Sequence, residues 1–442
     1  MSKYIPIEQI FSGIGLPEAT YVAQDNGGFE RQLRQGIKES GTLCLVTGSS
    51  KTGKTTLYNK VLAGLGRVPL IVRSDATVDS DEFWKKPLEK VDFNRLREVQ
   101  DTRSVESKAQ AKIGGEVGWK WLAGLIGEVS LGITGKRSES EIREVILSKP
   151  SPAHLVPLLK HTNAILVVED FHYLTEATQQ HIFQQWKVFT DEGVSVIVVG
   201  TTHHGVDLAY ANPDLVGRIQ QIDLKRWDNK DLEKIVTKGF EALKISCPPA
   251  VSRTLSSESA GLPIITQQAS AQLFADKDIE EVKAGAEINF SIQNAFDALH
   301  HVAVSRYKQF ESWYLRLKTG PRKRARKYNT YELILSIFEL DPPKFELARH
   351  EISERLSKLP VANTSLPPAA SVNSTLSALE TFQKKNGFEL LEWSKKNEAI
   401  YILEPAFLFY LRWKEEQTGA SFDDIKEVIR QVLESLNIKS SK

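Results

Sequence analysis

The sequence has few cysteines and almost no net charge, and each shortage excludes a class of protein. Only two cysteines, Cys44 and Cys247, occur in 442 residues, and Cys44 lies in an apolar strand-like run, as a small buried side chain does. This usage fits a reducing compartment. Lys and Arg number 57 against 56 Asp and Glu, a net charge of +1. No global field therefore draws the chain to nucleic acid or anionic lipid, and such binding would need a local patch.

Long apolar runs and internal repeats are missing as well. No stretch reaches the roughly 18–20 apolar residues of a membrane span, and the opening MSKYIPIEQI lacks the charged and apolar regions of a signal peptide. No repeat of about 20–50 residues appears. We therefore expect a cytoplasmic protein without membrane contact. Its length and its 41% hydrophobic content suffice for two or three domains, each with its own core.

The clearest motif lies at residues 48–55, where GSSKTGKT matches the phosphate-binding pattern G-x-x-x-x-G-K-[ST]. An apolar strand precedes it and a helix with one apolar face follows, which is the context that this motif requires. The glycines let backbone N–H groups surround a β-phosphate at the helix N-terminus. We expect Lys54 to reach the β- and γ-phosphates and the Thr55 hydroxyl to ligate Mg²⁺. The predicted nucleotide-binding residues are Gly48, Ser49, Ser50, Lys51, Thr52, Gly53, Lys54, Thr55 and Thr56.

A second element of the site follows an apolar run at residues 165–168, which is typical of a buried parallel strand. Glu169 and Asp170 come directly after it. We assign Glu169 to the magnesium shell and Asp170 to the attacking water. The alternative is a strand end whose acids cap the next helix. The presence of a phosphate loop in the same chain favours the catalytic interpretation.

Further along, a predicted helix leads to another buried strand that starts near Val194 and ends at Thr201 and Thr202. A polar residue at this strand end lies beside the γ-phosphate in nucleotide-driven switches, so Thr201 or Thr202 is our candidate sensor. The adjacent His203 and His204 point to opposite sides of the chain. We interpret them as polar loop residues rather than as a metal-binding pair.

Arg218 precedes a last short strand of the predicted sheet. In ring-forming ATPases an arginine at this place reaches the γ-phosphate of a neighbouring subunit. A surface arginine is an equal alternative, and the sequence leaves both open.

Together these motifs resemble the AAA+/STAND branch of P-loop ATPases. The phosphate loop resembles the Walker A motif, and LVVEDFHYL at residues 166–174 is similar to the Walker B motif of MalT-like STAND regulators. GLP at residues 261–263 resembles the GxP motif with which the helical lid of STAND and NB-ARC proteins touches adenine. The resemblance, which covers residues 15–415, implies ATP as the nucleotide with Pro263 near the base. No guanine-reading N-K-x-D element appears.

Two positions depart from the family pattern. Glu169 stands where aspartate is commoner, which bears on the metal geometry, and His203 stands where many STAND proteins have an arginine. The helix predicted at residues 28–37 resembles the one that those families place before the first strand.

The second half of the chain predicts a helical lid over residues 226–317, then a basic linker over 318–327, a winged helix over 328–415 and a C-terminal helix or tail over 416–442. The linker is either a solvated hinge or a patch that holds phosphates. Its candidate nucleic-acid contacts are Arg322, Lys323, Arg324, Arg326 and Lys327.

The winged helix is predicted from three helical segments followed by a hairpin. Its third helix is expected to expose Asn373, Ser374, Ser377 and Lys384, which makes Asn373 and Lys384 candidates for DNA contact. In STAND proteins a winged helix often locks the nucleotide within the same chain. The sequence leaves both roles open.

A glycine-rich apolar insert, residues 112–136 with Trp119 and Trp121, interrupts the predicted core. We expect either a hairpin that docks on a partner or neighbouring subunit, or a plain structural insertion. The predicted core spans residues 41–225, with the insert region at 100–140, after an N-terminal segment and leading helix at 1–40.

The sequence therefore predicts an α/β P-loop NTPase core with a parallel sheet, a helical lid and a C-terminal winged helix. Our leading hypothesis is an ATP- and Mg²⁺-dependent molecular switch that hydrolyses ATP and assembles into a homo-oligomer or engages a protein partner, with antiphage defence suggested by the resemblance alone. One alternative is a DNA-binding AAA+ ATPase of replication, recombination or transposition. Another is an adaptor that holds nucleotide without hydrolysing it.

Overall fold

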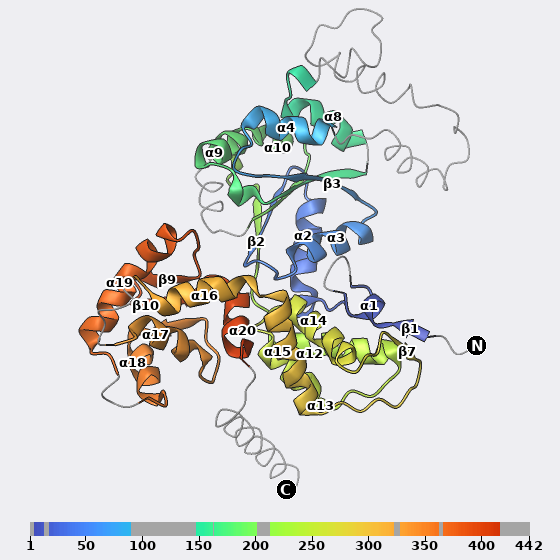
Figure 1. The fold of residues 1–442 in the computed structure, drawn as a ribbon. Helices are drawn as coiled ribbons and strands as arrows, with labels where there is room; N and C mark the ends of the chain where they lie inside the picture. Colours follow the sequence, from blue (N-terminus) through green and yellow to red (C-terminus); the bar gives the residue numbers. More distant parts are fainter. Residues whose placement is uncertain are drawn as a thin grey trace, which may run out of the picture. The chain divides into compact units, whose positions relative to one another are not determined.

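The chain divides into two compact units (Figure 1). Residues 23–226 form one, the sheet unit, and residues 1–22 with 227–442 form the other, the helical unit. The computed structural model describes residues 4–12, 17–89, 147–161, 163–200, 213–321, 328–361 and 366–415. Outside the described residues lie the 100–140 region with its 112–136 insert, Thr201, Thr202, His203, His204, Arg322, Lys323, Arg324, Arg326, Lys327 and the tail at 416–442.

The sheet unit is built on a five-stranded parallel sheet with the strand order β3-β4-β5-β2-β6. Four of these strands are apolar runs of β-branched and leucine residues, as expected for strands with both faces covered. Their bounds are β2 Leu43–Gly48, β3 Val68–Arg73, β4 Ala164–Glu169, β5 Val196–Val199 and β6 Ile219–Leu224.

Helices cover both faces of this sheet, and successive strand residues alternate between two apolar layers. Leu43 and Leu45 of β2 pack in the layer of α4, α8, α9 and α10, whereas Cys44 and Val46 pack in the layer of α2 and α3 (Figure 1). The helices are α2 Gly28–Lys38, α3 Lys54–Gly64, α4 Ser80–Glu89, α8 Pro152–His161, α9 Glu176–Gln185 and α10 Lys187–Asp191, with short 3₁₀ helices η1 Gln24–Gly27, η3 Phe171–Tyr173 and η4 Pro213–Leu215.

The first part of the helical unit combines five helices with the start of the chain. The helices are α12 Asn229–Leu243, α13 Pro249–Glu258, α14 Pro263–Ala275, α15 Ile292–Arg306 and α16 Gln309–Thr319. Near the N-terminus, β1 (Tyr4–Pro6) pairs antiparallel with β7 (Glu281–Lys283), and α1 (Ile7–Ile10) follows. The Phe11 ring then packs on Phe240 and so close to Gly239 that a Cβ there would lie 2.1 Å from it. The start of the chain is therefore part of the core of this unit.

The second part of the helical unit, the C-terminal module, has three helices, a three-stranded antiparallel sheet with the order β8-β10-β9, and a fourth, closing helix. Buried Gln383 joins its longest helix to the sheet, because its amide oxygen accepts from the N–H groups of Leu390 and Leu391 and its Nε2 donates to the Leu391 carbonyl. The elements are α17 Thr330–Glu339, β8 Glu346–Ala348, α18 Arg349–Lys358, α19 Ala369–Lys385, β9 Leu391–Ser394, β10 Ala399–Ile402 and the closing α20 Pro405–Trp413.

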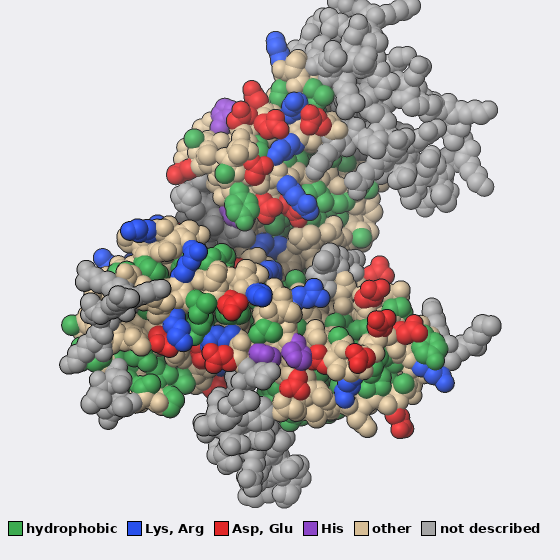
Figure 2. All heavy atoms as spheres, in the orientation of Figure 1, with side chains coloured by type: hydrophobic (Ala, Val, Ile, Leu, Met, Phe, Trp, Pro, Cys, Tyr) green, Lys and Arg blue, Asp and Glu red, His purple; other side chains and the backbone are tan. Residues whose placement is uncertain are grey.

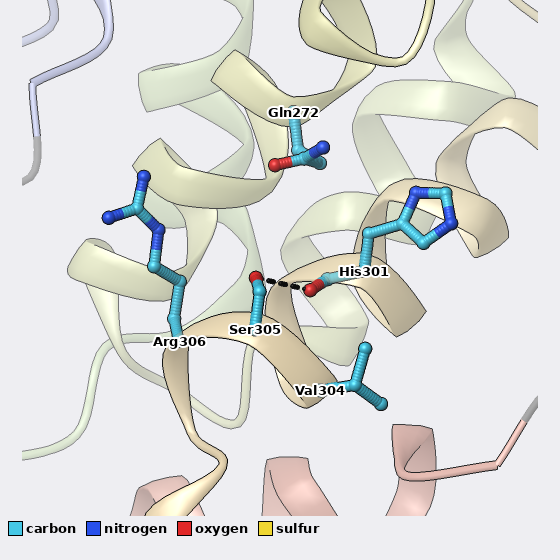
Figure 3. A pocket seen from close by; sticks show the side chains of 5 residues that line it. All are labelled: Gln272, His301, Val304, Ser305 and Arg306. Atoms are coloured by element: carbon cyan, nitrogen blue, oxygen red, sulfur yellow. Dashed lines mark hydrogen bonds between the residues drawn. The ribbon is translucent and has the colours of Figure 1, made fainter.

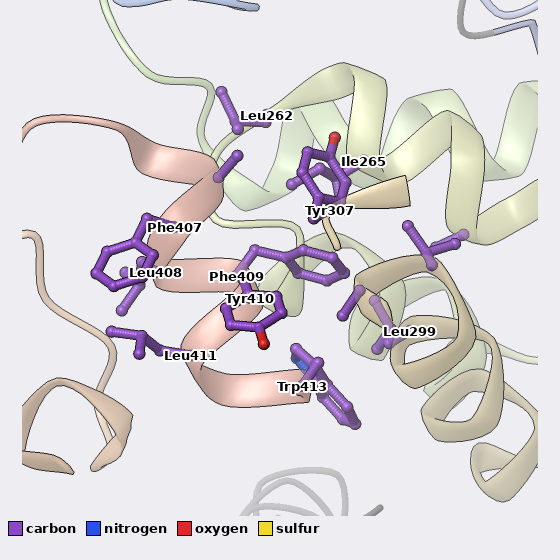
Figure 4. Close-up of a cluster of buried hydrophobic side chains, with 14 of the residues drawn as sticks. Leu262, Ile265, Leu299, Tyr307, Phe407, Leu408, Phe409, Tyr410, Leu411 and Trp413 are labelled. Atoms are coloured by element: carbon purple, nitrogen blue, oxygen red, sulfur yellow. The ribbon is translucent and has the colours of Figure 1, made fainter. Parts of the chain in front are cut away.

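Helix α20 joins the C-terminal module to the preceding helices through one continuous apolar core (Figure 4). The Phe409 ring meets Tyr307 edge to face at 5.6 Å, and Trp413 stacks on Phe296 at 5.4 Å. Next to these rings, the nearly buried Arg412 guanidinium pairs with Glu258 of α13 at 3.0 Å. Because charge and apolar contacts link the same elements, the two parts of this unit form one body.

Charged side chains of both signs are interspersed over the visible surface, in agreement with a net charge of +1 (Figure 2). In the part of the chain that the structure describes, no helix is both long and apolar enough to cross a lipid bilayer.

Candidate functional site

The phosphate loop between β2 and α3 has a backbone that only certain residues adopt easily. Gly48 has φ 134° and Gly53 has φ 96°, and Lys51 also has a positive φ of 63°. A Cβ at Gly48 would lie 2.5 Å from the Leu224 carbonyl oxygen of β6. Gly48 thus meets both a conformational and a packing requirement, and Gly53 meets a conformational one.

Lys54, the first residue of α3, folds back over the loop. Its Nζ donates to the carbonyl oxygens of Gly48 at 2.9 Å and Ser49 at 2.7 Å, while the buried Thr52 hydroxyl donates to Ser49 O at 2.9 Å. The ammonium group therefore lies over the loop at the N-terminus of a helix, where the helix dipole also favours an anion.

Glu169, the last residue of β4, is 7% exposed and accepts hydrogen bonds from three side chains on α3 and β3. Its Oε1 accepts from the Thr55 hydroxyl at 3.0 Å and from the Tyr58 hydroxyl at 2.9 Å, both on α3. Its Oε2 accepts from Arg73 Nε at 3.0 Å. Thr55 and Glu169, the two predicted metal ligands, are therefore in direct contact.

The strand order explains why these groups meet at one edge. The chain leaves β2 toward the β3 side of the sheet and leaves the neighbouring β5 toward β6 on the other side. At such a switch of direction, ligands bind in the crevice outside the carboxyl ends of the strands. The phosphate loop, Arg73 and Glu169 all stand at these carboxyl ends, and Arg73 and Glu169 are register partners.

The environment of the cluster shifts two pKa values in the directions that keep it hydrogen bonded. Burial, followed by the charge of Glu169, raises the pKa of Tyr58, so its phenol remains a donor. The hydrogen bond to Glu169 and its negative charge raise the pKa of Arg73.

Asp170 follows Glu169 in a left-handed conformation with φ 60° and is half-buried. Two residues later, burial lowers the pKa of His172, an effect that the charge of Asp170 opposes and that of Lys54 reinforces. Asp170, His172 and Lys54 thus share one electrostatic environment. The His172 ring also packs on exposed Tyr173 at 4.1 Å.

The sequence patterns did not indicate Tyr58, Arg73 or a further pair of residues at the same edge. The Thr47 hydroxyl at the end of β2 donates to Asp223 Oδ1 at 2.9 Å, across the ladder with β6. Tyr58 lies four residues after Lys54 on one helix face, which is a local signal that could have pointed to it. The partners of Arg73 and Thr47 depend on strand register, for which the sequence has no local signal.

Two predicted residues lie elsewhere. Arg218 directly precedes β6, at the amino-terminal edge of the sheet, and its Nη1 donates to the Thr190 carbonyl at 2.9 Å. A contact with a neighbouring subunit therefore stays a prediction for Arg218. Pro263 is the first residue of α14 in the helical unit, after Gly261 with φ 70°. Its contact with adenine stays a prediction as well.

The candidate nucleic-acid residues that can be placed lie on α19. Asn373, Ser374, Ser377 and Lys384 are all exposed, as expected. However, Lys384 pairs with Glu380 at 2.7 Å on the same helix face. The exposed face of α19 is therefore polar, with little net positive charge.

The donor set at Thr55 and Glu169 fits magnesium. Hydroxyl and carboxylate oxygens are the hard ligands that this ion prefers, and Mg²⁺ commonly binds through one or two carboxylates together with substrate phosphates. Within the described residues, no group of three or more His, Cys, Asp or Glu side chains is arranged as a metal site. The donors fit an ion that arrives with a nucleotide.

A hollow of about 480 Å³ lies on α14 and α15 of the helical unit (Figure 3). Its lining mixes polar and apolar side chains, and the Ser305 hydroxyl donates to the His301 carbonyl. None of the predicted site residues lines it. The lining residues are Gln272, His301, Val304, Ser305 and Arg306.

Comparison with family models finds no match, and comparison with curated proteins finds none either. Among solved structures, the chain is similar to the Walker-type ATPase PABY2304 of Pyrococcus abyssi, at 13% identity over 88% of this chain and 95% of that one, with a TM-score of 0.50. It is more loosely similar to Cdc6p of Pyrobaculum aerophilum (11% identity, 92% and 98% covered, TM-score 0.38) and to ORC1 of Aeropyrum pernix in complex with DNA (15%, 92% and 96%, 0.38).

The similarity to the Walker-type ATPase concerns the fold alone, and nothing is concluded from the two looser similarities. This first similarity and the five-stranded parallel sheet together confirm the predicted α/β P-loop core.

Proposed function

We propose that the protein binds and hydrolyses ATP with Mg²⁺. The observation that carries this proposal is the convergence of Lys54, Thr55 and Glu169 at the carboxyl ends of β2 and β4. The resemblance of the fold to a Walker-type ATPase supports it.

Each group has a role in this proposal. Lys54 and the backbone N–H groups of the loop hold the phosphates. Thr55 and Glu169 would hold Mg²⁺, which when bound neutralises charge on the phosphate oxygens. Asp170, the next residue, orients water and accepts its proton. Thr201 or Thr202 would contact the γ-phosphate, and Arg218 would serve a neighbouring subunit in a homo-oligomer.

We further propose an AAA+/STAND-type switch in which nucleotide alters the relation of the two units. The chain passes between the units at two places, residues 22–23 and 226–227. On one side, Val22 and Trp227 share a small core with Leu232. On the other, Gln24 Nε2 donates to the Lys225 carbonyl at 2.7 Å. The two chain segments that connect the units are therefore in contact with each other on both sides of the connection. We propose that ATP binding changes the relation of the units at this paired connection.

The helical unit suits such a switch, since α12 to α16, which we propose to be the lid, share one core with the C-terminal module. We propose that the module is a winged helix that engages a separate protein partner or locks the nucleotide. Antiphage defence is a proposed setting that rests on the family resemblance.

A second candidate is a DNA-binding AAA+ ATPase acting in replication, recombination or transposition. The element order of the C-terminal module and the exposed polar face of α19 favour it. The Lys384–Glu380 pair weighs against strong phosphate binding by α19 itself. Binding would then depend on the basic residues at 322–327.

The first experiment measures ATP turnover by the purified chain, with and without duplex DNA, beside Lys54→Ala. Turnover that falls roughly 10²–10³-fold in this variant supports hydrolysis at the proposed site. Stimulation by DNA that weakens as salt rises favours the DNA-binding candidate. Turnover that is indifferent to DNA favours the partner-gated switch.

A third candidate, an adaptor that holds nucleotide without hydrolysis, is tested with Asp170→Asn. Equal turnover in the wild type and this variant would favour the adaptor and remove Asp170 from the mechanism. A large loss of turnover with unchanged nucleotide affinity would assign Asp170 to the chemical step.

A further inference from the structure

We propose that Tyr58 and Arg73 set the strength with which magnesium and nucleotide binding are coupled: Tyr58 positions the Glu169 carboxylate, and Arg73 competes with Mg²⁺ for it. This inference rests on the proposed function and names two residues to which no role in it has been given.

Tyr58 has the geometry of a positioning residue. Its side chain is fully buried, and its hydroxyl donates to the same oxygen, Glu169 Oε1, that accepts from Thr55. Thr55 and Tyr58 lie three residues apart on α3, so one helix face presents both donors to one carboxylate oxygen. Because Thr55 gives its hydrogen to Glu169, its oxygen lone pairs remain for a metal ion. Tyr58 thus holds the Glu169 carboxylate in the position where it accepts the Thr55 hydrogen bond.

Arg73 approaches the other oxygen and differs from Tyr58 in charge and exposure. Its Nε donates to Glu169 Oε2 at 3.0 Å, yet the Arg73 side chain is 73% exposed whereas that of Glu169 is 9% exposed. The contact is built into the sheet, because Arg73 and Glu169 are register partners at the carboxyl ends of β3 and β4. An exposed cation is therefore held beside a nearly buried carboxylate.

The two residues predict effects of opposite sign. Loss of the neutral Tyr58 hydroxyl frees the carboxylate to rotate away from Thr55, which weakens the metal site. Loss of the Arg73 charge removes a cation that shares the same carboxylate, which strengthens binding of a divalent ion. A purely structural role would produce destabilisation in both variants and no opposite change in metal dependence.

The test measures the dissociation constant of the complex between the full chain and fluorescently labelled ADP, once with EDTA and once with Mg²⁺. The ratio of the two constants is the coupling. In Tyr58→Phe the ratio should fall roughly tenfold. In Arg73→Gln it should rise about 2–5-fold and less so at high salt, because the pair is exposed on one side. Arg73→Lys, which keeps the charge, should stay near the wild type.

Tyr307→Phe is the matched control, since buried Tyr307 donates to Gln268 at 3.1 Å in the helical unit. Ratios in both test variants equal to that of Tyr307→Phe would overturn the inference while leaving the proposed function intact, and so would a fall in both. If the wild type binds no labelled ADP in either buffer, the proposed function fails first and the inference fails with it.

Discussion

The two units bury charge for different purposes. Among its described residues, the sheet unit buries one carboxylate, Glu169, at the carboxyl-terminal edge of its sheet. The helical unit instead buries Arg355 and Arg412 between its elements: Arg412 pairs with Glu258 and Asp341, and Arg355 donates to the carbonyls of helix α17 and the turn after it. Glu169, at a strand end, is bonded to side chains of α3 and β3 at the edge where a ligand is proposed to bind. The buried arginines of the helical unit, in contrast, have all their described partners within that unit, where they join its elements.

The largest expected effect tests this difference in the helical unit. Arg412→Ala leaves the Glu258 carboxylate without its cation, which should lower the free energy of unfolding of this unit by about 3–5 kcal/mol. Denaturant unfolding followed by tryptophan fluorescence measures the change.

The control for this prediction is Lys358→Ala, because the Lys358–Glu354 pair is exposed on both sides. It should leave the free energy of unfolding nearly unchanged. Equal losses in the two variants would show that the Arg412 network does not join the elements of the helical unit.

The next effect tests the edge of the sheet unit. Gly48→Ala places a Cβ against the Leu224 carbonyl at a positive φ, so it should cost roughly 1–3 kcal/mol and weaken nucleotide binding at least tenfold. Gly66→Ala is the control, since Gly66 also has a positive φ but open space around it. Nucleotide binding by Gly48→Ala at the level of Gly66→Ala would contradict the prediction.

A smaller effect is expected where an uncharged buried side chain, rather than a buried charge, links elements of the helical unit. Gln383→Ala leaves two buried N–H groups and a carbonyl of β9 without their partner, at a cost of about 1–2 kcal/mol. Exposed Gln293→Ala should be nearly neutral when unfolding of both variants is compared. If Gln383→Ala is just as neutral, water replaces the lost bonds and α19 does not need this link.

The smallest effect is a pH dependence in the sheet unit. Burial lowers the pKa of His154 on α8, so the folded chain binds its proton less readily than the unfolded chain does. Its contribution to stability is therefore complete above the ordinary pKa of about 6.5 and is lost as pH falls through the lowered folded value. His154→Gln should lose less stability than the wild type between pH 8 and pH 5. If His154→Gln loses as much stability between pH 8 and pH 5 as the control variant of exposed His181, His181→Gln, this role of His154 is refuted.

Local sequence patterns were enough to predict one half of the candidate site. The glycines of the loop, Lys54 and Thr55 belong to one strand–loop–helix segment, so short-range geometry brings them together, and their role in nucleotide binding stays a prediction. Glu169 was predictable because an apolar run ends there, and parallel strands end at a common edge.

The start of the chain was not predictable in this way. The predicted N-terminal segment at 1–40 divides, since residues 4–12 pack in the helical unit while α2 packs on the sheet. Phe11 is one aromatic residue in a short segment without periodicity, and its partner Gly239 is distant in sequence. Only the folded core shows that the Phe11 ring fits because Gly239 has no side chain.

The sequence by itself determined the elements and the chemistry that they carry: a glycine loop before a helix, apolar strands, and acids at a strand end. The tertiary structure decided which of these groups meet. Arg73 and Glu169 are 96 residues apart, and they touch because β3 and β4 pair in parallel with one particular register. Strand register depends on the burial of whole faces rather than on any single residue, and so such pairs emerge only when the sheet is assembled.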